Sequence, residues 1–136
     1  WWAWGLRTLG LALIPWTVLL ALADGRRWFG DASTQAAWVV FDAGMVIALL
    51  GLARLVARAR PAAQWLSLVM TGATLTDFVL STVQALHLHR AVEGWSALFV
   101  AAGLAGPLTA TLYLLLLASV LIRTPSGPRS TRGRPG

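Results

Sequence analysis

Four apolar runs constrain the fold of this 136-residue chain more than any other feature. They cover Trp2–Ala23, Ala36–Ala57, Trp65–Leu88 and Trp95–Ile122, and each is near the ~20 residues that a helix needs to cross a ~30 Å hydrocarbon layer. Backbone groups in lipid must be hydrogen-bonded within the protein, and no run alternates with the period of two that a barrel strand requires. The sequence therefore predicts an all-α, four-helix transmembrane bundle.

The connections between the runs are short, which predicts an up-down-up-down arrangement with both ends of the chain on one side of the membrane. We expect one transmembrane domain over residues 1–122. Residues 123–136 are rich in Arg, Pro and Gly, so we expect them to form a disordered cytoplasmic tail. The chain opens on Trp1 and not on Met, so we also expect native residues before it.

The positive charge of the chain gives its orientation. The net charge is +6, and all 11 cationic residues are arginines. They are concentrated after the second and fourth runs, so the positive-inside rule predicts that both termini are cytoplasmic in the cell membrane. The arginines do not form one helix face with interleaved aromatics, so we expect the lipid bilayer, and no nucleic acid, as the partner.

The sequence lacks the residue patterns of several common catalytic and metal-binding sites. There is no Cys, which excludes disulfides, thiolate metal sites and cysteine nucleophiles. No phosphate-binding Gly-rich loop and no Ser-His-Asp order is present. His87 and His89 point about 200° apart on a helix, so they make a poor shared metal site. We therefore expect no catalytic residues, no metal and no cofactor.

Two aspartates, Asp42 and Asp77, lie inside apolar runs, where an ionised carboxylate costs about 2.5–3.5 kcal/mol on insertion scales. Asp77 belongs to a polar stripe that recurs at helical spacing along the third run. The stripe comprises Ser67, Thr71, Thr74, Asp77, Ser81, Gln84 and His87. Such a stripe should face the bundle interior, either hydrogen-bonding other helices or lining a wet crevice, although Ser and Thr can also bond to carbonyls of their own helix.

The heights of these residues predict a polar seam centred on Asp42 and Asp77, with Thr74, Ser81 and Gln84 beside them. Asp42 lies ~9 Å and Ser81 ~10 Å from the same membrane face, at 1.5 Å per helical residue. If the second and third runs pack together, a hydrogen-bonded chain Asp42–Ser81–Asp77 is expected. This seam is the candidate ligand or proton site.

Small residues predict where helices approach closely. In the second run Gly44, Ala48 and Gly51 form one face. In the fourth run Gly103 lies one helical turn before Pro107 and Gly106 lies directly before it, and both glycines would permit close packing. The tryptophans, including Trp28 and Trp38, are expected to form belts at the two membrane interfaces. Trp16 lies deeper beside Pro15, and a ligand-stacking role is open for it.

Three segments, Pro15–Val18, Ala37–Asp42 and Ala73–Asp77, resemble a family of uncharacterised four-span integral membrane proteins of actinobacteria. The likeness covers about the first two-thirds of the chain. In the family pattern a second Asp often follows the third-span Asp by four residues, where this chain has Ser81. The resemblance implies the four-span topology and the importance of Asp42 and Asp77, and it implies no activity.

The sequence favours a multi-pass membrane protein of unknown function that is non-catalytic, with a structural or interaction role for its buried polar seam. The alternative is a small proton-coupled transporter or ligand carrier that uses the seam as its site, and a lipid-modifying enzyme is the least favoured class. A homodimer or a partner membrane protein is left open. A dry, fully paired seam would indicate the structural role, and a cavity that touches both aspartates would indicate the carrier.

Overall fold

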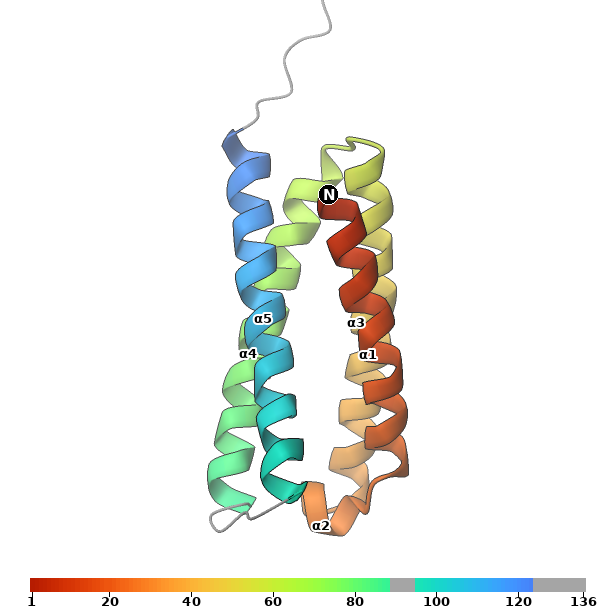
Figure 1. Ribbon diagram of the computed structural model, residues 1–136, viewed down its shortest axis with the longest axis vertical. Helices are drawn as coiled ribbons and strands as arrows, with labels where there is room; N and C mark the ends of the chain where they lie inside the picture. The colour runs from red at the N-terminus through yellow and green to blue at the C-terminus, as the bar shows by residue number, and fades with distance from the viewer. Residues whose placement is uncertain (89–94, 124–136) are drawn as a thin grey trace, which may run out of the picture.

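The computed structural model describes residues 1–88 and 95–123, and all regular elements in these ranges are α-helices (Figure 1). The helices are α1 (Trp2–Leu22), α2 (Gly25–Phe29), α3 (Ala32–Ala57), α4 (Ala62–Leu88) and α5 (Trp95–Arg123). Four of them, all except α2, are long and apolar enough to cross a membrane. The expected disordered tail lies outside the described residues.

The helix starts follow local capping chemistry. Asp31 caps α3, because its carboxylate accepts a hydrogen bond of 2.8 Å from the backbone N–H of Thr34. The helix therefore begins at Ala32, four residues before the apolar run. Similarly, α4 begins directly after Pro61, whose ring fits the first turn of a helix. Hydropathy locates the apolar part of each helix, and the caps add polar turns to it.

The long helices are arranged as two pairs. Helix α1 packs along α3, and α4 packs along α5, whereas contact between α3 and α4 is much less extensive (Figure 1). The N-terminus and the end of α5 lie at one end of the bundle, and the short helix α2 lies at the other. The second and third apolar runs do meet, but each has its main partner elsewhere.

The half of the bundle nearest the N-terminus is closely packed, and we call it the closed half. Its fully buried leucines come from three helices, namely Leu6, Leu52, Leu114 and Leu117. The Tyr113 hydroxyl donates a hydrogen bond of 2.9 Å to the backbone carbonyl of Trp2, which ties α5 to the start of α1. This half holds the two helix pairs together.

Most of the glycines that were predicted to permit close helix packing make no close contact within this chain. Other glycines do. A Cβ atom on Gly44 or Gly51 would meet nothing within 4 Å, so no neighbouring helix of this chain approaches the predicted packing face at either glycine. Gly106 also faces open space. At Gly103 an added Cβ would lie 3.4 Å from the Trp16 ring, an ordinary packing contact.

Among the long helices, the closest contacts at glycine are made by two glycines of α1. A Cβ atom on Gly5 would overlap the phenol of Tyr113, and one on Gly10 would lie 3.3 Å from the Leu50 side chain. Glycine at these positions lets α1 pack closely against α3 and makes room for the Tyr113 side chain of α5. The small residues that set the packing of the closed half are therefore on the first helix.

Candidate functional site

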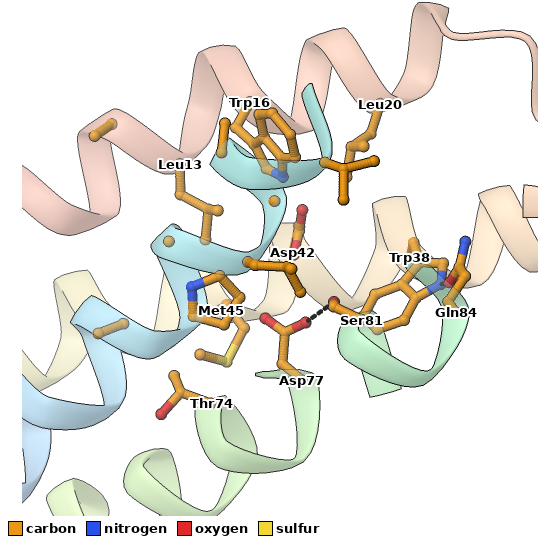
Figure 2. A pocket seen from close by; sticks show the side chains of 18 of the residues that line it. Leu13, Trp16, Leu20, Trp38, Asp42, Met45, Thr74, Asp77, Ser81 and Gln84 are labelled. Carbon is orange, nitrogen blue, oxygen red and sulfur yellow. Dashed lines mark hydrogen bonds between the residues drawn. The ribbon is translucent and has the colours of Figure 1, made fainter. Parts of the chain in front are cut away.

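A cavity of about 290 Å³ lies between the two helix pairs, in the half of the bundle nearest α2. We call this the cavity half. All five helices contribute to the walls, which are mostly apolar (Figure 2). The polar exceptions include the aspartates of two long apolar helices, Asp42 and Asp77. The structure thus brings together two acids that lie 35 residues apart in the chain.

Asp42 is the more enclosed of the two acids. It is only 4% exposed, and its Oδ2 atom is buried without a hydrogen-bond partner among the described residues. Trp38 and Met45, four residues before it and three after it on α3, line the same cavity (Figure 2). A helix face that carries an indole, a carboxyl and a thioether therefore forms one wall. Because a buried polar atom without a partner costs free energy, this position requires an explanation.

Asp77 is part of the opposite wall, formed by α4. The Ser81 hydroxyl, one helical turn further along, donates a hydrogen bond of 3.1 Å to Asp77 Oδ1 (Figure 2). Thr74, Asp77 and Ser81 all line the cavity, as the spacing of the polar stripe predicts. Within the described residues, no hydrogen bond links Asp42 to either of the other two. Of the expected series of hydrogen bonds from Asp42 through Ser81 to Asp77, only the one between Ser81 and Asp77 is therefore present.

Gln84 closes the cavity half at the α2 end. Its Oε1 atom accepts a hydrogen bond of 3.0 Å from the Trp38 indole, and its Nε2 atom donates one of 3.0 Å to the backbone carbonyl of Trp28. One side chain thus joins α4 to both α3 and α2. Helix α2, which the hydropathy pattern did not predict, forms part of the wall through Trp28 and Phe29.

The rest of the polar stripe has a different role. Ser67 and Thr71 donate hydrogen bonds to carbonyls of their own helix, at 2.7 Å and 2.8 Å. Thr74 is buried and hydrogen-bonded at 2.9 Å to Thr111, which connects α4 to α5. The side chain of His87 lies outside the described residues. The stripe therefore serves helix packing toward the closed half and lines the cavity toward α2.

Among the described residues, three tryptophans line the cavity, namely Trp16, Trp28 and Trp38. For Trp16 this is the position that a ligand-stacking role requires, and its ring also packs on Gly103. Trp28 and Trp38 were expected only at the membrane interface. For Trp38 the sequence does contain a signal. Trp38 lies four residues, or about one helical turn, before Asp42, and this spacing places its indole beside the acid.

The residues that line the cavity are suited to binding a ligand. None of the described residues that line the cavity is basic, so no described arginine neutralises either acid there. Among the described residues, no group of three or more His, Cys, Asp or Glu side chains could hold a metal ion. What the geometry offers is an apolar, aromatic pocket with carboxyl groups on opposite walls.

Comparisons with protein-family models, with curated proteins and with solved structures found no match for this chain.

Proposed function

We propose that this chain is a non-catalytic, multi-pass membrane protein that carries a small, lipid-soluble ligand in the cavity between its two helix pairs. The supporting observation is that Asp42 lines this cavity while its buried Oδ2 atom has no hydrogen-bond partner among the described residues. The structural role requires a dry, paired seam, because an unpaired buried acid only weakens a purely structural bundle. A ligand that hydrogen-bonds to this atom accounts for its retention.

The shape and composition of the cavity support the same proposal. Ligand sites are typically concave and mostly apolar, with a few polar groups that fix the orientation of the ligand. At about 290 Å³ the cavity lies at the lower end of the usual range for small-molecule sites. The polar groups include Asp42 and Asp77, and tryptophans provide flat contact surfaces.

The topology completes the proposal. We infer an up-down-up-down bundle in the cell membrane with both termini in the cytoplasm. Arg54, Arg58 and Arg60 lie at the end of α3 and in the following turn, and Arg123 ends α5. Under the positive-inside rule, this end of the bundle is cytoplasmic. The closed half then lies in the inner leaflet, and the cavity half in the outer leaflet.

The test is binding of the fluorescent probe 1-aminoanthracene, which is small, flat and uncharged near neutral pH. The protein would be reconstituted in lipid nanodiscs, with protein-free nanodiscs to subtract partition into lipid. We expect saturable binding of one probe per chain. Ala110→Phe places a ring in the cavity and should weaken binding at least tenfold, because Ala110 lines the wall.

The matched control is Ala105→Phe. Ala105 lies on the same helix but is exposed and does not line the cavity, so this variant should bind the probe like the original chain. Absence of saturable binding, or equal binding by both variants, would contradict the proposed function.

A further inference from the structure

We propose that the natural ligand is a lipophilic organic cation, such as a hydrophobic amine or quaternary ammonium compound. This inference rests on the proposed function and specifies the chemistry of the ligand. Its starting point is that the described residues that line the cavity include two acids and no basic residue. In a low-dielectric site, opposite charges attract far more strongly than in water. Two acids that lack a basic partner among the described residues therefore favour a positively charged ligand.

The hydrogen-bond pattern of the walls points in the same direction. The Trp38 indole donates to Gln84, and Gln84 donates to Trp28. The hydroxyl groups of Thr74 and Ser81 are directed to the Met70 carbonyl and to Asp77. These donors are engaged within the protein, while an acceptor, Asp42 Oδ2, is left over. The site therefore fits a ligand that brings positive charge or donors, and it does not fit an anion.

The aromatic and apolar lining indicates an organic ion instead of a metal ion. A cavity of about 290 Å³ is much larger than one ion, since a single water takes about 30 Å³ of liquid volume. Leu13, Leu20 and Met45 on the walls offer no oxygen ligands to replace a hydration shell (Figure 2). Indole faces, by contrast, attract ammonium groups through the ring quadrupole. Trp16 and Trp38 lie in the wall on the side of Asp42 (Figure 2).

The experiment compares two probes that differ only in charge. The cation is (4-phenylbutyl)trimethylammonium, and its neutral isostere carries a tert-butyl group in place of the trimethylammonium group. Competition against bound 1-aminoanthracene in nanodiscs gives both affinities, after correction for the partition of each probe into the lipid. We expect the cation to bind at least tenfold more tightly than the isostere. In Asp42→Asn and in Asp77→Asn this preference should fall to less than threefold, while the isostere still binds.

Binding of the isostere also shows that each variant is folded with its cavity intact. Asp31→Asn is the control, because Asp31 caps α3 outside the cavity and its replacement should leave the preference unchanged. Equal affinity for both probes in the original chain would overturn the cation assignment and leave the proposed function standing. A cation preference that survives both cavity variants would also overturn it. If neither probe displaces 1-aminoanthracene and that dye does not bind saturably, the proposed function itself fails.

Discussion

The closed half and the cavity half of the bundle are built from the same four long helices, yet they differ in what fills the space between the helix pairs. In the closed half Leu6, Leu114 and Leu117 are fully buried, and the Tyr113 side chain of α5 reaches so near to Gly5 of α1 that an added Cβ atom would overlap its phenol. In the cavity half the corresponding space is lined by tryptophans and two acids and is not filled. Helix association in lipid depends on close packing, so stability should be concentrated in the closed half and ligand chemistry in the other.

The largest difference between the halves should appear when a leucine is truncated. Leu117→Ala removes a fully buried side chain of α5 and should lower the free energy of unfolding by about 2–5 kcal/mol, because it leaves a void in a packed region. Leu104→Ala, on the same helix, already faces the cavity and should cost about 1 kcal/mol or less. Unfolding by SDS in mixed micelles measures both. Equal losses would mean that the two halves are not packed differently.

A second comparison uses two glycines. Gly5→Ala places a methyl group against the Tyr113 phenol and should destabilise the protein by about 1–3 kcal/mol through overpacking. Gly44→Ala places the same group in open space and should be neutral or stabilising by up to about 1 kcal/mol, since Ala is the better helix former. The same SDS titration applies. Adding Tyr113→Phe should recover part of the Gly5→Ala loss, and no recovery would argue against the Tyr113 contact as its cause.

The acids of the cavity half should behave as functional, not stabilising, residues. Asp42→Leu removes a buried oxygen without a partner, so the free energy of unfolding should rise by about 1–2 kcal/mol. Asp77→Leu should raise it less, because this change also removes the acceptor of the Ser81 hydroxyl. Thermal unfolding in nanodiscs without ligand would show the order. A clear loss of stability in Asp42→Leu would restore the structural role that the sequence favoured.

The smallest effect should come from pH at the start of α3. Hydrogen bonds from the Ser33 hydroxyl and from the Thr34 N–H and hydroxyl lower the pKa of Asp31 from its ordinary value of 3.8 to about 2. A lowered pKa means that the ionised form stabilises the folded state, so this contribution is complete above about pH 4 and is lost as the pH falls toward 2. Asp31→Asn should flatten this part of the pH profile, as measured by hydrogen exchange of the first turn of α3. An unchanged acid profile would contradict the capping role.

The sequence predicted the helices well because their cause is local. Twenty apolar residues in a row can satisfy their backbone in lipid only as a helix, and Arg-Pro at residues 60 and 61 marks a break without any tertiary information. The small helix α2 was missed, since five residues between two spans leave no hydropathy signal. The polar stripe also placed Thr74, Asp77, Ser81 and Gln84 on one face, as the structure shows.

Pairing of the helices could not be predicted in the same way. The short link after α3 suggested α4 as its main neighbour, but lipid is as apolar as leucine, so the partner is chosen by side-chain fit. That fit depends on Gly10 meeting Leu49 and Leu50, which lie about 40 residues away. Gly44, Ala48 and Gly51 have the right spacing for a packing face, and spacing alone does not say which way the face turns. The cavity arises from this pairing. The polar stripe predicted a crevice along α4 as one alternative, but the walls that α1 and α2 contribute could not be predicted.

The tryptophans around the cavity have a practical consequence. Trp16, Trp28 and Trp38 line it, whereas Trp1, Trp4 and Trp65 are exposed on the outside of the bundle. The ultraviolet emission of the unlabelled protein is therefore divided between rings that sense the pocket and rings that sense the surrounding lipid. Brominated lipids would quench the second group selectively, leaving an optical signal that comes mainly from the pocket.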